Sequence, residues 1–390
     1  MPPIKELTDC RVLIVDDAKP NVDMLVEALR GDFKVSVALD GEAALRAVAK
    51  APPDLVLLDI MMPGIDGYEV CRRLRADPAT REIPIMFLSS LEDVQDKTRG
   101  FELGANDYLT KPFEILEVKA RVRSLVKAKA YADAVRAAQE RDLAIAREIQ
   151  MGILPSDIPS ITRGTGLDIH ATIEPARQVG GDLFEVLRLS DDRVVVALGD
   201  VCGKGIPSSL FMAVTVTLLR TLARQLNGPG EILTRLNEEL AAQNPRAMFV
   251  TMACLDVRGS RVTCANAGHD ATMLVRRSGA TESVFASSGT VLGLFPGREY
   301  ATETLELEDG DSLVLYTDGV TDAADPEGGL FGEERLRACF AGGAGGTATE
   351  TVDLLLRAVR AFAGGAPQSD DITILALRRM AATPSGAARP

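Results

Sequence analysis

The sequence predicts an α/β protein with an N-terminal doubly wound parallel sheet and a C-terminal domain built mainly on antiparallel sheets. Two observations lead to this fold class. Up to about residue 125, apolar strand-like runs alternate with helical patterns, which is typical of βα units. Beyond residue 165, strand-like runs follow one another and only a few helical stretches interrupt them. A length of 390 residues is enough for two or three domain cores.

The N-terminal third contains five predicted βα units. Its strands are predicted at 11–15, 33–39, 54–59, 83–89 and 106–110. Helical patterns lie near 20–30, 41–50, 66–76 and 92–103, and another begins at 113. Five such units make a complete five-stranded doubly wound domain, which has its binding site at the carboxyl ends of the strands.

Polar residues collect at those strand ends. Asp16 and Asp17 end the first strand, and Asp59 ends the third. Ser89 ends the fourth strand, and Lys111 follows the fifth. Three carboxylates can hold one Mg²⁺, and such a site suits an aspartyl nucleophile that accepts a phosphoryl group. The alternative is an ordinary α/β domain with polar loop ends.

The stretch LLDIMMPGIDGYEV resembles the response-regulator receiver family, and the resemblance covers the whole N-terminal domain. It implies a flavodoxin-like fold in which Asp59 accepts a phosphoryl group from a histidine kinase. The implied ligands of the Mg²⁺ ion are Asp16, Asp17, Asp59 and the main-chain carbonyl of Met61. The implied switch residues are Ser89, Tyr108 and Lys111, the last with a cis peptide bond to Pro112.

From residue 113 the helical pattern continues without Gly or Pro as far as Gly152. We therefore expect a receiver domain at 1–125, a helical linker at 126–152, a second domain at 153–380 and a flexible tail at 381–390. Apolar residues at helical spacing favour pairing of the linker with a second copy as a coiled coil, and hence a homodimer. A solvated spacer helix is the alternative. In both cases the helix would couple the two domains mechanically.

The C-terminal domain is predicted as an α/β-layered antiparallel β-sandwich with its helices outside. Its helical stretches lie near 206–226, 229–243 and 350–363. The strand-like runs are 167–175, 184–190, 193–200, 249–257, 261–268, 271–277, 312–318 and 371–378.

Short carboxylate turns stand beside several of these strands. They are Gly180-Gly181-Asp182, Gly199-Asp200, Thr317-Asp318-Gly319 and Asp370-Asp371-Ile372-Thr373. Strand ends deliver side chains to one edge of a sheet, and converging carboxylates suit hard divalent cations. Two such cations would lower the pKa of a bridging water, which could attack phosphorus without a protein nucleophile. The alternative is that these are ordinary turn residues.

The motifs EPARQVGGDLFEV, LGDVCGKGIPSSLFMA, NAGH, YTDGVTDA and DDIT resemble the metal-dependent PPM-type phosphatases. The branch with sporulation stage II protein E and the sigma-regulating phosphatases is the most similar. The resemblance implies two Mn²⁺ or Mg²⁺ ions and a phosphorylated STAS-domain anti-anti-sigma protein as the serine/threonine substrate. The implied catalytic metal ligands are Asp182, Asp200, the Val201 carbonyl, Asp318 and Asp370.

Four more residues are candidates for this site. Asp371 adjoins a ligand, and Glu185 stands where the family commonly has Asp. Arg177 and Lys204 are either phosphate contacts or ordinary surface and loop residues.

Composition excludes several other classes of function. A net charge of −13 argues against binding to nucleic acid or to an anionic membrane surface. Only two histidines are present, which argues against a His-rich zinc site. Six cysteines without a C-x-x-C pair, and the lack of a signal-peptide pattern, predict a cytoplasmic location.

Two rival functions remain. GGDLF superficially resembles the GGDEF signature of cyclic-dinucleotide cyclases, but it lacks the Glu directly after the Asp. A degenerate phosphatase fold that only binds a phosphoprotein is the second rival. The sequence favours a two-component response regulator in which phosphorylation of Asp59 controls a metal-dependent protein phosphatase.

Overall fold

The structure is a computed structural model that describes residues 5–90, 98, 100–343 and 345–381. The chain divides into two compact units, Met1–Asp142 and Leu143–Pro390. The boundary falls within one helix, α5 (Ile115–Ile153). Of the helix predicted at 92–103, residue 98 and residues 100–102 are helical, whereas 91–97 and 99 lie outside the described residues. Residues 382–390 of the predicted tail also lie outside them.

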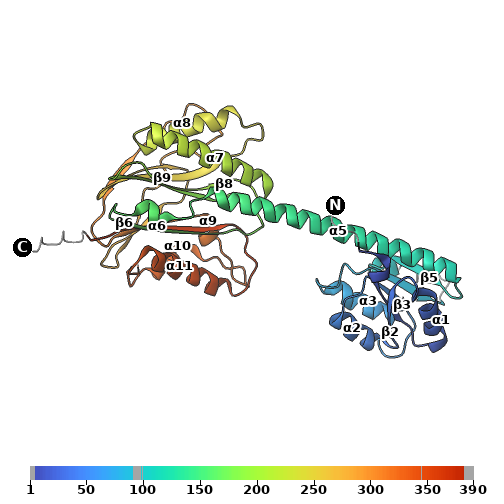
Figure 1. Ribbon diagram of the computed structural model, residues 1–390. Helices are drawn as coiled ribbons and strands as arrows, with labels where there is room; N and C mark the ends of the chain where they lie inside the picture. The colour runs from blue at the N-terminus through green and yellow to red at the C-terminus, as the bar shows by residue number, and fades with distance from the viewer. Residues whose placement is uncertain (1–4, 91–97, 99, 344, 382–390) are drawn as a thin grey trace, which may run out of the picture. The chain divides into compact units, whose positions relative to one another are not determined.

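The first unit contains a five-stranded parallel sheet in the order β2-β1-β3-β4-β5 (Figure 1). This arrangement confirms the predicted doubly wound sheet, because every strand pairs in parallel. The strands are β1 (Arg11–Val15), β2 (Lys34–Ala38), β3 (Leu55–Asp59), β4 (Ile85–Ser89) and β5 (Asp107–Thr110). A short 3-10 helix (Leu7–Asp9) precedes them, and the helices are α1 (Lys19–Leu29), α2 (Gly41–Lys50), α3 (Gly67–Ala76) and α5.

Side-chain alternation along the strands builds a core on each face of this sheet. In β1, Leu13 and Val15 belong to one buried cluster, whereas Val12 and Ile14 belong to the other. The second cluster also contains Val118, Val122 and Val126 from the beginning of α5. Helical spacing of four residues places these valines on one face of α5, which therefore begins as the last helix of the first unit.

The second unit contains two five-stranded antiparallel sheets, in the orders β13-β10-β9-β8-β7 and β12-β11-β14-β15-β6. Figure 1 shows α7 (Ile206–Gln225) and α8 (Pro229–Ala242) outside one sheet, and α10 (Gly332–Cys339) and α11 (Ala348–Ala363) outside the other. This confirms the predicted layered sandwich. Its strands are β6 (Leu167–Glu174), β7 (Leu183–Arg188), β8 (Arg193–Val201), β9 (Val250–Arg258), β10 (Arg261–Ala267), β11 (Thr272–Val275), β12 (Thr281–Val284), β13 (Glu303–Glu306), β14 (Ser312–Tyr316) and β15 (Ile372–Arg379).

Several short elements of the second unit were not predicted. β12 and β13 are edge strands of four residues with mostly exposed side chains, so they lack the apolar pattern of the central strands. The helices α6 (Ile158–Thr162), α9 (Asp318–Thr321) and α10 were also missed. Elements this short carry too few apolar positions for a period to be recognised.

One helix among the described residues, α7, is long and apolar enough to cross a membrane by length and composition. Core helices of soluble proteins pass the same test. In this fold Met212, Val216 and Leu219 of α7 are fully buried in the large cluster that also contains residues of β8 and β9. Packing against the first antiparallel sheet explains the apolar residues on this face of α7, whereas Ile206, Leu210 and Val214 of the same helix are exposed.

Candidate functional site

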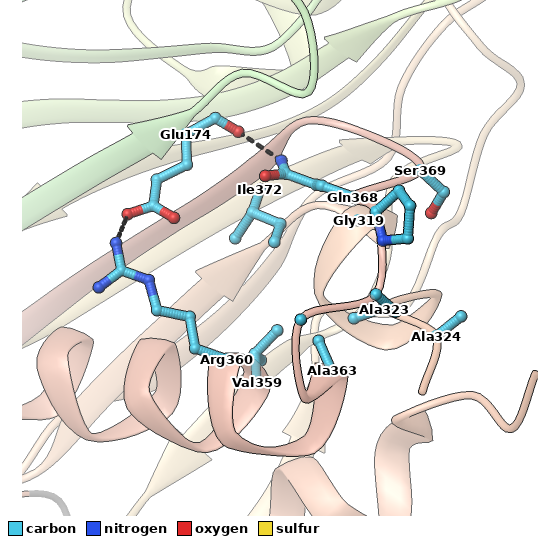
Figure 2. A pocket seen from close by; sticks show the side chains of 13 residues that line it. Glu174, Gly319, Ala323, Ala324, Val359, Arg360, Ala363, Gln368, Ser369 and Ile372 are labelled. Carbon is cyan, nitrogen blue, oxygen red and sulfur yellow. Dashed lines mark hydrogen bonds and ion pairs between the residues drawn. The ribbon is translucent and has the colours of Figure 1, made fainter. Parts of the chain in front are cut away.

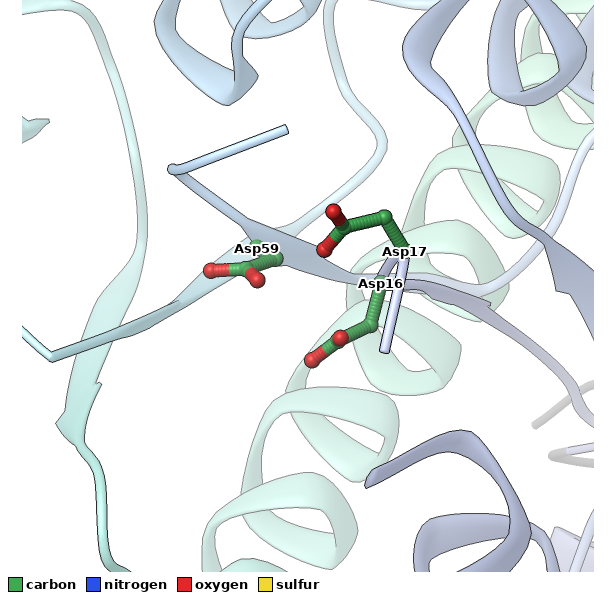
Figure 3. A group of neighbouring side chains, drawn as sticks. All are labelled: Asp16, Asp17 and Asp59. Carbon is green, nitrogen blue, oxygen red and sulfur yellow. The ribbon is translucent and has the colours of Figure 1, made fainter. Parts of the chain in front are cut away.

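Three carboxylates meet at the carboxyl ends of β1 and β3 in the first unit. Figure 3 shows Asp16 and Asp17 beside Asp59, and one oxygen of each lies within 4.8 Å of the others. Asp16 and Asp59 are 0% and 5% exposed. A compact set of oxygen donors with this charge fits one Mg²⁺ ion.

Lys111 supplies the positive charge in this site. Its Nζ lies 2.7 Å from Oδ2 of Asp16 and 2.8 Å from Oδ2 of Asp59. Burial raises the pKa of Asp59 above its usual range, although Lys111 opposes this effect. The peptide bond between Lys111 and Pro112 is cis. The amide of Met61 donates to Oδ1 of Asp59 at 3.4 Å, which holds that backbone beside the carboxylate.

The two remaining predicted switch residues belong to neighbouring strands. Leu88 pairs with Asp59 across β3 and β4, so Ser89 lies one residue beyond that pair and is fully buried. Tyr108 of β5 pairs with Phe87 and is 9% exposed. Strand pairing thus brings Ser89 to the same end of the sheet as Asp59.

Strand register also explains how the aspartates of the second unit are paired. Leu183 of β7 is opposite Gly199 of β8, which brings Asp182 and Asp200 to one end of the first antiparallel sheet. Tyr316 of β14 is opposite Ile374 of β15, which brings Asp318 close to the Asp370-Asp371 turn. In antiparallel pairs the end of one strand lies beside the start of the next, so residues far apart in sequence become neighbours.

Hydrogen bonds join these two pairs across the sandwich. Oδ2 of Asp182 accepts hydrogen bonds from the hydroxyls of Thr317 at 2.9 Å and Thr373 at 2.5 Å. Asp371 accepts a hydrogen bond from the amide of Gly181 at 2.8 Å. The sequence analysis quoted both threonines within the motifs YTDGVTDA and DDIT but assigned them no role in the site.

The four aspartates also act on one another electrostatically. Burial and the neighbouring Asp200 raise the pKa of Asp182 well above its ordinary value. Burial and Asp318 raise the pKa of Asp200 to about 7. Burial and Asp370 likewise raise the pKa of Asp318. Ionised carboxylates held this close need positive charge, so the donor set fits divalent cations.

The glycines before Asp182 allow the loop to approach this group closely. A Cβ atom on Gly181 would overlap the carbonyl of Val201 and lie 3.0 Å from Oδ1 of Asp200. A Cβ atom on Gly180 would fall on the carboxylate of Asp371. Any side chain at either position would therefore displace a predicted metal ligand or its neighbour.

The remaining candidates lie in different environments. Nζ of Lys204 is 2.9 Å from Oδ2 of Asp370, so Lys204 contacts the carboxylate group. Glu185 is buried and forms an ion pair of 2.5 Å with Arg220 of α7. Arg177 is exposed.

His269 is buried and has hydrogen-bond partners on both ring nitrogens. Its Nε2 lies 3.1 Å from the carbonyl of Tyr316, which can only accept a hydrogen bond, so Nε2 carries the proton. Nδ1 then accepts from the hydroxyl of Thr251 at 2.9 Å. Burial lowers the pKa of His269 to about 4, which keeps this ring neutral and fixes the strand end before Asp318.

A cavity of about 320 Å³ is lined by residues next in sequence to two of the aspartates. Gly319 and Ser369, which flank Asp318 and Asp370 in sequence, contribute to its wall. Figure 2 shows the side chains that line it, among them the ion pair between Glu174 and Arg360. The apolar lining residues include Ala323, Val359, Ala363 and Ile372.

Comparisons with known proteins agree with this geometry. Residues 12–123 match the family model of the response regulator receiver domain, and residues 190–380 match that of stage II sporulation protein E (SpoIIE). The chain joins a response-regulator receiver domain to a SpoIIE-type PP2C phosphatase domain. The phosphatase match contains Asp200, Asp318 and Asp370, and Asp182 lies shortly before it.

Individual relatives resemble this regulator over parts of their length. Response regulator PleD of Caulobacter vibrioides is 46% identical over 127 residues, which are 32% of this chain and 28% of PleD. Protein IcfG of Synechocystis is 28% identical over 262 residues, which are 60% of this chain and 40% of IcfG. The chain thus spans less than half the length of these relatives.

A solved structure supports the fold of the phosphatase domain. The SiaA-PP2C domain of Pseudomonas aeruginosa superposes with a TM-score of 0.56 at 23% identity. The match covers 63% of this chain and 98% of the SiaA domain. This similarity concerns the fold alone. The SpoIIE match gives no support to the cyclase interpretation of GGDLF, whose aspartate instead begins β7 of the sandwich.

Proposed function

We propose that this regulator is a metal-dependent protein serine/threonine phosphatase, and that phosphorylation of Asp59 raises its activity. The proposed catalytic activity is supported chiefly by the position of the two aspartate pairs, Asp182 with Asp200 and Asp318 with Asp370, at one edge of the sandwich. Burial and mutual repulsion raise the pKa values of Asp182, Asp200 and Asp318, so this group is built to receive cations. A purely phosphoprotein-binding domain would have no need for such a costly carboxylate group.

The proposed ligands are Asp182, Asp200, Asp318, Asp370 and the carbonyl of Val201. Two Mn²⁺ or Mg²⁺ ions held by these ligands would supply the Lewis acidity for hydrolysis of a phosphate ester. Within the described residues, only the receiver site has three ligand atoms of separate side chains within 4.8 Å of one another. The phosphatase carboxylates are therefore more widely spaced, which supports two ions there and one Mg²⁺ in the receiver.

Residues around the carboxylates would orient them and the substrate. The hydroxyls of Thr317 and Thr373 hold one oxygen of Asp182, so its other oxygen keeps a defined direction. Asp371 fixes the glycine loop through the amide of Gly181. Lys204 places an ammonium group at the edge of the site, where it could contact the phosphate of the substrate.

The proposed substrate is a phosphorylated STAS-domain anti-anti-sigma protein. The resemblance to the sigma-regulating phosphatases supports this class of substrate. The cavity beside Asp318 and Asp370 also supports a protein substrate, because it could receive side chains next to the phosphorylated residue. With a net charge of −13, we expect neither a nucleic-acid nor a membrane partner, and we propose a cytoplasmic location.

Regulation is proposed to begin with a histidine kinase that phosphorylates Asp59. The regulator is proposed to be a homodimer through its linker helix. Three apolar residues of α5 support this, since Val135, Ile145 and Ile149 are 39%, 51% and 63% exposed. A second copy could cover these side chains in a coiled coil.

The test is phosphate release from a phosphorylated STAS-domain protein with Mn²⁺ or Mg²⁺, with and without a phosphodonor for Asp59. We expect Asp182→Ala and Asp318→Ala to abolish release while Asp59 still becomes phosphorylated. Asp59→Ala should keep the basal rate and lose the response to the phosphodonor. Full activity of the first two variants would refute the catalytic proposal. Equal rates for wild type and Asp59→Ala in both conditions would refute the regulatory one.

A further inference from the structure

The last turn of α5 contacts the loop that carries Asp182. Gln150 is 5% exposed, and both ends of its amide bind one residue, Gly180. Nε2 donates to the carbonyl of Gly180 at 2.8 Å, and Oε1 accepts from the amide of Gly180 at 3.2 Å. This pairing satisfies the side chain and the backbone together. Its loss would leave buried polar groups without partners.

The opposite side of the same loop has no free space. Gly181, the next residue, donates to Asp371 and lies against the Val201 carbonyl and Asp200. The loop is thus held between Gln150 on one side and the carboxylate group on the other. Because not even a methyl group fits on that second side, a shift of Gln150 must move the loop or the ligands.

A second contact fastens the end of α5 to the same part of the fold. The guanidinium of Arg220 donates to the carbonyl of Ile153 at 2.5 Å and pairs with Glu185 of β7. Glu185 therefore acts in this structure as part of an anchor, and its strand begins directly after Asp182. The end of α5 is thus bound to the chain on both sides of Asp182. Gln150 bonds to Gly180, which precedes Asp182, and Arg220 links Ile153 to Glu185, which follows it.

We propose that Gln150 is a positioning residue, through which the end of helix α5 holds the Gly180-Gly181-Asp182 loop in the geometry that binds metal. The proposal rests on the proposed phosphatase function, and it names the point where α5 reaches the metal ligands. Since α5 is one unbroken helix from Ile115 to Ile153, a change at its receiver end that turns or shifts its last turn would act on Asp182 through this amide.

Metal affinity tests the proposal independently of catalysis. Mn²⁺ binding is measured by calorimetry on the full chain, in an Asp16→Asn/Asp17→Asn background that removes the receiver site. Gln150→Met, which keeps the length and loses both hydrogen bonds, should weaken Mn²⁺ binding about tenfold, as for other residues that orient metal ligands. Gln139→Ala, at an exposed position of the same helix, is the control and should bind as the parent does.

Activity then separates this proposal from the proposed function. If the protein is a phosphatase, Gln150→Met should need about tenfold more Mn²⁺ for half-maximal phosphate release and approach the parental rate at saturating Mn²⁺. If neither protein releases phosphate, the binding experiment still decides the role of Gln150. Unchanged Mn²⁺ affinity in a folded Gln150→Met protein would overturn the proposal.

A second measurement covers the case in which Gln150→Met does not fold. In the parent protein, Mn²⁺ should slow amide hydrogen exchange both in the segment around Gly180 and in the last turn of α5, since one amide joins them. Protection of the Gly180 segment alone would overturn the proposal.

Discussion

The hydroxyl of Thr373 donates a hydrogen bond of 2.5 Å to Oδ2 of Asp182, and this bond joins the two sheets of the phosphatase domain. Thr373 belongs to β15 of one sheet, whereas Asp182 immediately precedes β7 of the other. Both residues are buried. The orientation of the carboxylate therefore depends on the packing of the sandwich and not on its own loop alone.

Replacement of Thr373 by Val should weaken metal binding without removing a ligand. Val keeps the shape of Thr and loses the hydroxyl donor, so Asp182 would be less well oriented. We expect Mn²⁺ affinity, measured by calorimetry in the receiver-site double variant, to fall about tenfold. Thr373→Ser retains the hydroxyl and should bind as the parent does. Equal affinity of the Val and Ser variants would contradict this role.

Without metal, the phosphatase domain should lose stability as pH rises. The folded-state pKa of Asp200 is about 7, compared with 3.8 for an ordinary Asp, so the folded state binds the proton more tightly. The stabilisation from this difference in pKa is complete below pH 3.8 and is lost as the pH rises through about 7. In EDTA, the unfolding midpoint should be a few degrees lower at about pH 8 than at about pH 5.5.

Asp200→Asn is the matched variant for the pH experiment. Its side chain cannot ionise, so the difference between parent and variant midpoints reports the titration of Asp200 together with its electrostatic coupling to Asp182 and Asp318. Mn²⁺ should restore the parent protein at about pH 8 and have a weaker effect on Asp200→Asn. If the unfolding midpoint of the parent rose with pH relative to that of Asp200→Asn, the prediction would be wrong.

Lys111→Met should destabilise the receiver domain in the absence of Mg²⁺. The variant leaves the buried carboxylates of Asp16 and Asp59 without their ammonium partner. Removing one partner of a buried ion pair costs about 3 kcal/mol in the free energy of unfolding. Added Mg²⁺ should recover part of this, since it supplies positive charge to the same oxygens.

Lys34→Met is the control for the receiver experiment. Lys34 pairs with Asp9, but their side chains are 60% and 61% exposed, so we expect a much smaller loss of stability than for Lys111→Met. Chemical denaturation with and without Mg²⁺ measures both variants. Equal losses of stability in Lys111→Met and Lys34→Met would mean that the loss in Lys111→Met does not come from the unpaired carboxylates of the buried site.

Ala363→Phe should impair protein substrates selectively. Ala363 lines the cavity beside Asp318, and a phenyl ring there would fill space proposed for the side chains of the substrate. We expect about a tenfold rise in KM for the phosphorylated STAS-domain protein. Hydrolysis of a small aryl phosphate should not change. Ala361→Phe, on an exposed position of the same helix, is the control. Equal KM values for the two variants would exclude the cavity as a binding surface for the protein substrate.

The receiver domain could be predicted nearly completely from the sequence. Its binding residues stand at the ends of parallel strands, and all parallel strands present their carboxyl ends at one edge. The chain order therefore places Asp16, Asp59 and Lys111 together once the strands are recognised. The long helix from residue 113 could be recognised too, because it lacks Gly and Pro over many turns.

The phosphatase site was predicted by its aspartates but not by the residues that orient them. Edge strands such as β12 lack an apolar pattern, and Thr317, Thr373 and Gln150 carry no metal-binding chemistry of their own. Glu185 was a candidate for the site, yet the fold directs it to Arg220. These relationships depend on which sheets and helices pack together.

The sequence by itself determined the four aspartate turns, because strand ends, glycine and carboxylate chemistry are local properties. Only the tertiary structure decided how the turns meet. Antiparallel register pairs Asp182 with Asp200 and brings Asp318 to the Asp370 turn, and the packing of the two sheets joins the pairs through Thr317 and Thr373. The contact of Gln150 with Gly180 likewise arises only when α5 packs against the folded domain. Contacts between distant segments form through burial and hydrogen bonding in the packed state, and no local pattern encodes them.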